Sequence, residues 1–480
     1  MKIENTYFSI ILVFIDLFLY INTYIAIPFK TFKNLEIIKS SSDAKEFLSM
    51  NINNTIYIEL ETGLPTQKIP ALIMSEEFGF FIINHKCLIP SSFDTVEKST
   101  TFSKSELYKD YTYNFRTQTD MIFGNDFFIF PTDSSKKQAL LNFMYSPNLQ
   151  NRSSIKEENC DLHFFDDNNH KYTCAGIGIR GAQYLGKDYE KNLIKQLFHE
   201  NIINNNFFSI IYQSNDEGTF LIGAEPHTYN KKKFFESQLR HISTVENNFF
   251  IFWSLHPEKI YFSLKNKMFN ITNNLICSLE YNLGVIYGTD IYLQLIKENY
   301  FNQLISENKC HEEIVNSIYN VFYCNNIKDI EKFPTLYFYI QQFLYTFNLN
   351  YKDLFYKHNE KYFFKVIFDK NNKNQWKLGK PFLKKYTFLY DYDSKTIGFY
   401  NEKLPKGSKK SKISNFLINT FYAIIIIAFG FLGFYYGKKI YHKIRKKRVN
   451  EIEDGYEYKF KNNEQTNFYS HLEMMINPNK

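Results

Sequence analysis

Acidic residues follow apolar, strand-like stretches at two places in the chain. Residues 71–83 read ALIMSEEFGFFII, with Glu76 and Glu77 in the turn, and residues 284–296 read GVIYGTDIYLQLI, with Asp290 after a Gly-Thr pair. Two carboxylates held against each other share a proton, so one can act as a base on water while the other acts as an acid. Such a pair needs equivalent positions in the two stretches.

Other catalytic or cofactor chemistry has little support. Cys160 and Cys174 lie near His163 and His170, but their spacing is longer than four-ligand zinc sites use. Ser91 has no placed His-acid pair that would make it a nucleophile. The chain has no glycine-rich phosphate loop. We therefore expect neither a metal nor a cofactor.

The segment between residues 50 and 402 reads mostly as strands. Short β-branched and aromatic runs alternate with Gly, Pro, Asn and Asp turns, as in NTIYIELET (54–62), QKIPALIM (67–74) and FFSIIYQS (207–214). Apolar spacing of three and four predicts helices at 188–201 and 291–306. The pattern predicts an all-β unit with few helices.

Two apolar segments define the topology. Residues 1–26, with Lys2 and an apolar run from residue 8 to 26 that contains Asp16, read as a secretory signal peptide, with an uncleaved anchor as the alternative. Residues 416–436 are 21 residues without a charge, long enough as a helix to cross ~30 Å of hydrocarbon. We expect this second segment to be a transmembrane helix.

The charge distribution orients that helix. Residues 438–448 hold seven lysines and arginines, which equals the net charge of +7. Basic flanks stay on the cytoplasmic side, so the main part of the chain should be lumenal or extracellular, in the secretory or endosomal system or at the cell surface. The rest of the chain is nearly neutral, and this argues against nucleic-acid binding. Residues 402–415 read as a linker and 437–480 as a cytosolic tail, in which YSHL (Tyr469 to Leu472) has the form of a sorting signal.

The order of motifs resembles the pepsin-like aspartic proteases over about residues 55–401. The resemblance rests on three stretches: IYIELETGLPTQKIPALI (56–73), AGIGIRG (175–181) followed by a helix, and QWKLGKPFLKKYTFLYDYDSKTIGFY (375–400). The last stretch is similar to the family's closing strands at fixed offsets. The resemblance implies two facing β lobes, at 55–225 and 226–401, preceded by a short, irregular leader at 27–54.

The resemblance also implies one catalytic Asp per lobe, each in an Asp-Thr/Ser-Gly loop. Aligned with that pattern, Met74 stands at the first Asp, with Ser75 and Glu76 after it. In the second lobe Gly288 and Thr289 align with the Gly-Thr that follows the Asp-Ser pair, so Ile286 stands at the second Asp. Both carboxylates are then missing.

Neighbouring acids do not replace them in this alignment. Glu76 follows Met74 by two residues and Asp290 follows Ile286 by four, so the two acids have unequal offsets. We expect a pepsin-fold, single-pass (type I) membrane protein without catalysis that binds peptides or partner proteins on its lumenal side. The alternatives are an aspartic endopeptidase with a non-standard dyad and a purely structural surface protein.

Cysteines and sequons fit an oxidising, glycosylating compartment. The resemblance implies a disulfide between Cys310 and Cys324, whose loop would add ~3 kcal/mol to stability. A second bridge between Cys160 and Cys174 fits a hairpin, while Cys87 and Cys277 could be free, paired together or bonded to a partner. Glycan acceptors are expected at three sequons: Asn53, Asn151 and Asn270.

Overall fold

The fold is seen in a computed structural model that describes most of the region between residues 23 and 401. The described ranges are 23–32, 42–52, 54–75, 79–87, 98–113, 117–132, 135–146, 172–182, 192–246, 250–271, 275–371, 375–401 and 435–445. The chain divides into one compact unit ending at Lys403 and a second running from Leu404 to Lys480. The first unit holds the sheets and all helices but one, the helix at 435–445.

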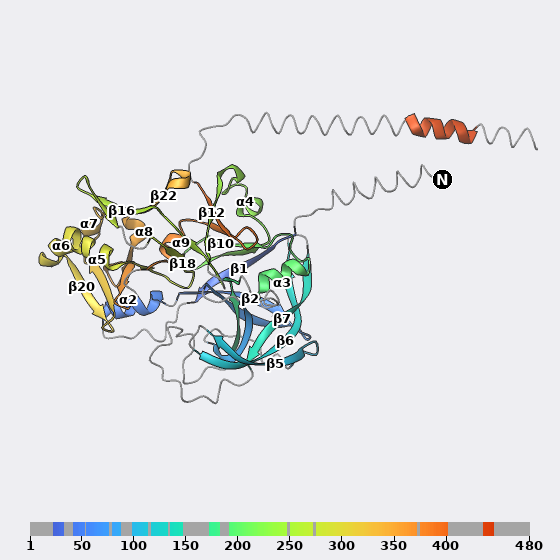
Figure 1. The fold of residues 1–480 in the computed structure, drawn as a ribbon, viewed down its shortest axis with the longest axis horizontal. Helices are drawn as coiled ribbons and strands as arrows, with labels where there is room; N and C mark the ends of the chain where they lie inside the picture. The colour runs from blue at the N-terminus through green and yellow to red at the C-terminus, as the bar shows by residue number, and fades with distance from the viewer. Residues whose placement is uncertain are drawn as a thin grey trace, which may run out of the picture. The chain divides into compact units, whose positions relative to one another are not determined.

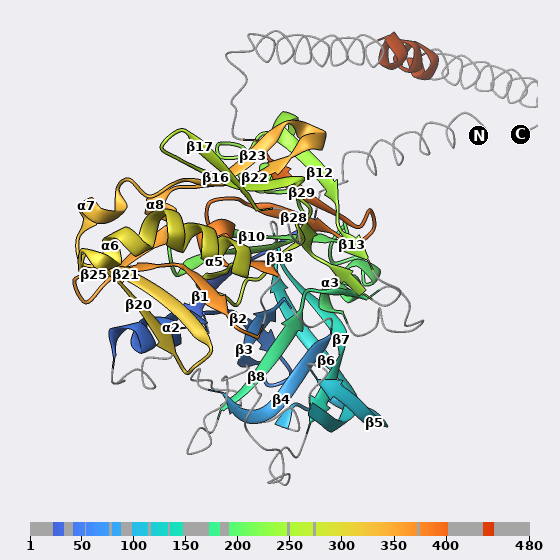
Figure 2. The ribbon, with the colours of Figure 1, turned by 60° about the vertical axis from the view of Figure 1, so that its left-hand side comes forward.

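A 13-stranded sheet links the two halves of the first unit. Its order is β12-β29-β28-β10-β11-β1-β2-β3-β8-β4-β7-β6-β5, and Figures 1 and 2 show β3 to β8 on one side of the unit and α5 to α7 with β20 on the other. Its strands are β1 (Ile25–Phe32), β2 (Thr55–Thr62), β3 (Gln67–Met74), β4 (Phe80–Cys87), β5 (Ser103–Tyr113), β6 (Thr117–Pro131), β7 (Lys136–Ser146), β8 (Tyr172–Gly178), β10 (Phe207–Tyr212), β11 (Glu217–Ile222), β12 (Leu239–Ser243), β28 (Phe388–Asp391) and β29 (Thr396–Tyr400).

The remaining strands form three smaller sheets. The nine-stranded sheet holds β15 (Ser254–Leu255), β18 (Cys277–Leu279), β19 (Ile286–Tyr287), β20 (Cys310–Val315), β21 (Tyr319–Cys324), β24 (Phe355–His358), β25 (Lys361–Phe364), β26 (Val366–Asp369) and β27 (Trp376–Leu378). A four-stranded sheet holds β16 (Lys259–Leu264), β17 (Lys267–Ile271), β22 (Leu336–Ile340) and β23 (Tyr345–Leu349). A three-stranded sheet holds β9 (Gly181–Ala182), β13 (Val245–Glu246) and β14 (Phe250–Phe252).

Helices in the first unit are short. They are α2 (Asp43–Ile52), α3 (Leu193–His199), α4 (Pro226–Tyr229), α5 (Asp290–Ile296), α6 (Asn302–Ser306), α7 (Ile327–Ile330), α8 (Tyr351–Leu354) and α9 (Lys380–Leu383), with the 3-10 turns η6 (Glu236–Gln238) and η8 (Gln341–Phe343). The predicted helix at 188–201 is α3, which begins after Asn192, whose side chain accepts from two backbone N–H groups. The predicted helix at 291–306 is α5, a π-helical turn η7 (Lys297–Phe301) and α6 in succession.

Burial follows from strand periodicity. Strand β2 alternates between buried and more exposed positions, as expected for a half-buried strand, while β3 becomes buried on both faces from Ile69 onward. The cores are rich in rings; Phe208 stacks on Tyr390 with ring centres 4.7 Å apart, which joins β10 to β28. Aromatic side chains at such contacts bury large areas and fix the packing of the strands.

Two parts of the predicted irregular leader form regular secondary structure. Residues 25–32 form β1, which pairs with both β11 and β2, so the strand also includes two residues that the sequence assigned to the signal peptide. Residues 43–52 form α2, whose Phe47 is fully buried and stacks on Phe363. The prediction that this segment is irregular was wrong, because apolar side chains of β1 and α2 are buried in the hydrophobic cores.

No helix among the described residues is long and apolar enough to cross a membrane. The predicted span at 416–436 falls outside the described residues except for Tyr435 and Tyr436, which begin the exposed helix at 435–445. The linker at 402–415 and the tail beyond residue 445, with Tyr469 and Leu472, also lie outside the described part.

Candidate functional site

The end of β3 is where sequence analysis placed the first lost acid. Strand β3 runs parallel to β8, with Ile73 opposite Ile177 and Met74 opposite Gly178. The chain returns as β4 on the other side of β8, where Phe80 also faces Ile177. Met74 is only 2 % exposed. An apolar side chain is therefore buried at this strand end.

The second half of the unit repeats this arrangement. Strand β18 runs parallel to β27 with Leu279 opposite Leu378, and β19 returns antiparallel with Ile286 opposite the same Leu378. Leu378 thus has the position of Ile177 in the first half. The two halves therefore share the same pattern of strand pairing.

The register identifies the residues that correspond. Ile73 and Phe80 face one residue of the middle strand and are seven residues apart, as are Leu279 and Ile286. Ile286 is then the counterpart of Phe80, and the residue after Leu279, Glu280, is the counterpart of Met74. The alignment that put Ile286 at the second lost position differs from this register by six residues. The second half carries a carboxylate where the first carries Met74.

Glu280 and the first strand end are in direct contact. The hydroxyl of Ser75, which follows Met74, donates a hydrogen bond of 2.6 Å to Oε2 of Glu280. Both side chains are half-buried. A hydrogen bond to a carboxylate is stronger than one between neutral groups. This bond holds the two strand ends together across the two halves.

Two buried phenols lie near Glu280: Tyr281, the next residue, and Tyr390. The hydroxyls of Tyr281 and Tyr390 are 2.6 Å apart. Burial raises the pKa of both phenols, and the charge of Glu280 raises the pKa of Tyr390 further. Both rings therefore remain neutral at physiological pH and act as hydrogen-bond donors or acceptors, not as bases.

The N-terminal helix supports the second loop. The N–H of Gly284 donates to the carbonyl of Asn51 at 2.7 Å, and the N–H of Asn54 donates to the carbonyl of Asn282 at 3.0 Å. A Cβ on Gly284 would lie 2.8 Å from that Asn51 carbonyl oxygen, closer than real Cβ contacts. A glycine is needed here because the two backbones approach so closely.

The other residues predicted for the site are distributed around it. Glu76 lies outside the described residues. Gly288 and Thr289 follow β19, with Thr289 buried at the start of α5 and Gly288 packed against Phe368. Asp290 is the first residue of α5. Gly288, Thr289 and Asp290 thus belong to the strand-to-helix turn beyond the loop that carries Glu280.

The cysteines and sequons are only partly within the described chain. Cys310 and Cys324 form the predicted disulfide across the β20–β21 hairpin. Cys277 is a free, buried thiol. Cys160 and the side chains of Cys87 and Cys174 are outside the described set, as are Asn53 and Asn151, while Asn270 is exposed on β17.

The sequence comparison fits this repeated geometry. Residues 165–401 match the family model described as Eukaryotic aspartyl protease. This part of the chain belongs to the eukaryotic aspartyl protease family. The matched segment includes β8, β18, β19 and β27, whereas β3 and Met74 precede it. No curated protein matches the chain.

Within this aspartyl protease domain, sequence reasoning missed Glu280. The signal was present, because Glu280 is the sole acid between Cys277 and Tyr287 and directly follows a short apolar strand. The sequence alignment instead matched Gly288 and Thr289 to the Gly-Thr of the family motif, and this put the acid position at Ile286. Among the residues described, no group of three or more His, Cys, Asp or Glu side chains is arranged to hold a metal.

Proposed function

We propose that the chain is a non-catalytic, pepsin-fold membrane protein that binds peptides or partner proteins on its lumenal side. One observation carries the proposal: Met74, buried at the end of β3, is the counterpart of Glu280 at the end of β18. Aspartic-protease chemistry needs two carboxylates that share a proton around one water. A thioether cannot act as a base or an acid in that reaction.

The Ser75 contact supports a structural role for the remaining acid. Its hydroxyl occupies one oxygen of Glu280 at 2.6 Å, so the carboxylate joins the two halves. A peptide lying near this junction would meet the serine and the carboxylate. These groups can bind the amides and side chains of an extended peptide without cleaving it.

The direct test is a peptidase assay on the purified chain across pH 3 to 7, with and without pepstatin, using a peptide library and mass spectrometry. We expect no pepstatin-sensitive cleavage. Cleavage that is lost in Glu280→Gln would overturn the non-catalytic proposal. Peptides retained by the wild-type chain and by Glu280→Gln would identify ligands that bind without being cut.

The Glu280 carboxylate also favours a second candidate function. Glu280 stands at an acid position of the repeat, and Glu76 immediately follows its partner Ser75 in sequence. An endopeptidase with a Glu76–Glu280 dyad would use these two groups. Here Glu76→Gln and Glu280→Gln should each abolish cleavage, whereas Glu77→Gln should not.

Membrane attachment is part of the proposal. The uncharged run at 416–436 followed by the basic cluster at 438–448 supports a single span with a cytosolic tail, and the exposed Asn270 supports glycosylation of the domain. Protease protection of sealed vesicles tests the orientation. Glycosidase sensitivity that is lost in Asn270→Gln tests the acceptor.

A further inference from the structure

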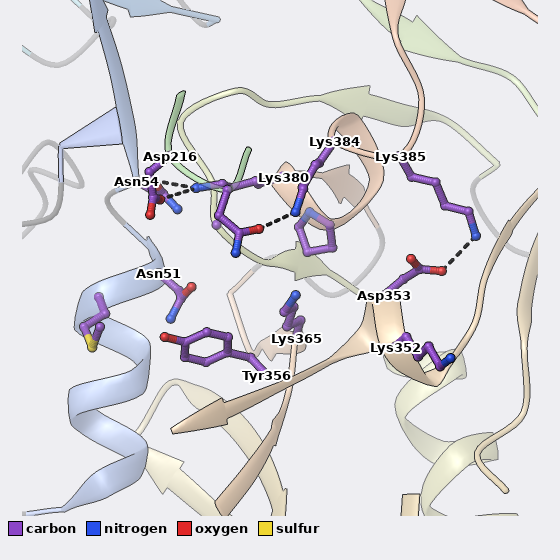
Figure 3. Close-up of a pocket in the computed structure, with 14 residues that line it drawn as sticks. Asn51, Asn54, Asp216, Lys352, Asp353, Tyr356, Lys365, Lys380, Lys384 and Lys385 are labelled. Carbon is purple, nitrogen blue, oxygen red and sulfur yellow. Dashed lines mark hydrogen bonds and ion pairs between the residues drawn. The ribbon is translucent and has the colours of Figure 1, made fainter. Parts of the chain in front are cut away.

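A polar pocket of about 460 Å³ is lined by neither Ser75 nor Glu280. Its walls come from α2, the turn between β10 and β11, α8, β24 and α9 (Figure 3). Gly284, in the loop between β18 and β19, also lines it. The volume is in the range of sites for small molecules.

The lining is dominated by positive charge. Five lysines and two aspartates contribute to it: Lys352, Lys365, Lys380, Lys384, Lys385, Asp216 and Asp353. Lys380 is paired with Asp216 at 3.1 Å, and Lys385 with Asp353 at 2.8 Å. Each aspartate is thus already engaged by one lysine, and the lysines outnumber the acids.

Lys365 is a half-buried cation of this pocket that has no ion pair within the described chain. Its ammonium has no hydrogen bond within the described chain and lies 5.9 Å from the centre of the Tyr356 ring. In Figure 3 the end of the Lys365 side chain points into the pocket, and the Tyr356 hydroxyl points toward α2, beside Asn51. Burial and the neighbouring Lys384 lower the pKa of Lys365 to about 8.

A partly buried cluster of like charges is costly without a counter-ion. Removing an ammonium from water disfavours its charged form, and a neighbouring like charge disfavours it further. A bound anion reverses both effects. Lysine is a compact point charge that binds phosphate and other oxyanions without demanding one orientation.

We propose that this pocket binds a small, multiply charged oxyanion, with Lys365 as its central cation. Lys384 stands beside it, and the Tyr356 hydroxyl and the Asn51 amide supply neutral hydrogen-bonding groups. The side chain of Lys380 is only 12 % exposed and closes the wall toward Asp216. The site is separate from the proposed peptide-binding role, because neither Ser75 nor Glu280 lines this pocket.

Isothermal titration of the full chain in detergent with pyrophosphate, and separately with citrate, tests the proposal. We expect saturable binding of at least one of these anions, weakened tenfold or more by Lys365→Met. Lys259→Met, at the exposed first residue of β16, should change the affinity less than twofold. The anion that binds distinguishes phosphate from carboxylate chemistry. Absence of binding for both, or equal weakening by both variants, would overturn the site.

A labelling experiment covers the case in which Lys365→Met fails to fold. Pyridoxal 5′-phosphate forms an imine when an uncharged lysine amine attacks its aldehyde carbon and water leaves; borohydride then reduces the imine to a stable amine. At pH 8 we expect mass spectrometry to find Lys365 among the first lysines modified, with protection by whichever anion binds. Modification of exposed lysines alone, with Lys365 unlabelled, contradicts the proposal.

Discussion

Ser75 Oγ lies 2.6 Å from Glu280 Oε2, and this bond joins two residues that are 205 positions apart in the chain. It lies where two strand–loop–strand motifs of the same length face each other. The contact brings Glu280, which sequence reasoning did not single out, next to the serine that follows the missing acid. The first prediction concerns this bond.

Replacing Ser75 with Ala should destabilise the domain by about 1 to 3 kcal/mol, because a half-buried carboxylate loses a hydrogen bond. Urea unfolding of the purified chain measures the change. Ser243→Ala, at an exposed position of β12, is the matched control and should have almost no effect. If both substitutions cost the same, the Ser75 bond contributes nothing specific.

Restoring the missing acid should be destabilising. Met74→Asp places a carboxylate at a position that is 2 % exposed, at an expected cost of about 2 to 4 kcal/mol at pH 7. Burial raises the pKa of such a group in the folded state, so the folded chain binds more protons than the unfolded chain and stability falls as pH rises. The loss should be smaller at pH 4, whereas Met74→Leu should cost less than about 1.5 kcal/mol at both pH values. A loss that is independent of pH would contradict this.

Helix α2 should be required for folding. Phe47→Ala removes a fully buried ring that stacks on Phe363, so we expect a loss of about 3 to 5 kcal/mol. Limited proteolysis should then cut within 43–52 much faster than in the wild type. Phe235→Ala, at a ring that is 42 % exposed, serves as the control. Unchanged proteolysis of Phe47→Ala would mean that α2 is not anchored there.

The hairpin disulfide should account for a separate part of the stability. Cys310 and Cys324 are 14 positions apart, and opening that loop is expected to cost ~3 kcal/mol in the chain-entropy model. Unfolding with and without reductant measures it in the wild type and in Cys277→Ala, which removes the free thiol. Reductant should destabilise a Cys310→Ala/Cys324→Ala double variant by about that amount less than it destabilises the wild type.

Lys365 should reduce stability at neutral pH when no anion is bound. Its folded pKa of about 8 lies below the usual 10.5, so the unfolded chain binds more protons between these values and stability rises with pH across that interval. Lys365→Met should therefore stabilise the anion-free chain by about 1 to 3 kcal/mol at pH 7, and by less at pH 10. Lys259→Met should show no such pH dependence. A gain that persists unchanged at pH 10 would rule out the charge as the cause.

The strands of this fold were largely accessible from the sequence. The β-branched runs predicted at 54–62 and 67–74 correspond to β2 and β3, because period-two burial leaves a clear pattern. The position of the loop that carries Glu280 could not be predicted from the sequence in the same way. Its partner strands β18 and β27 are only three residues each and lie about a hundred positions apart, so only their pairing register reveals which residue ends the strand.

The segment at 25–52 illustrates the other limit of sequence reasoning. Strand β1 is short, and its position depends on β11 and β2, while α2 depends on a cluster built from β21 and β25. Local composition cannot reveal such distant partners. The resemblance pointed to the family but not to the use of this segment inside it.

The pairing of β1 also bears on how the chain is made. Ile25 pairs with Ile222, and Phe207 pairs with Asp391, so the central sheet is completed only when nearly the whole domain exists. At about 5 to 20 residues per second, a newly synthesised β1 waits roughly 10 to 40 s for β11. Throughout that interval its apolar residues can bind chaperones or pair with the wrong segments. The yield of folded protein therefore depends on which of these two processes is faster.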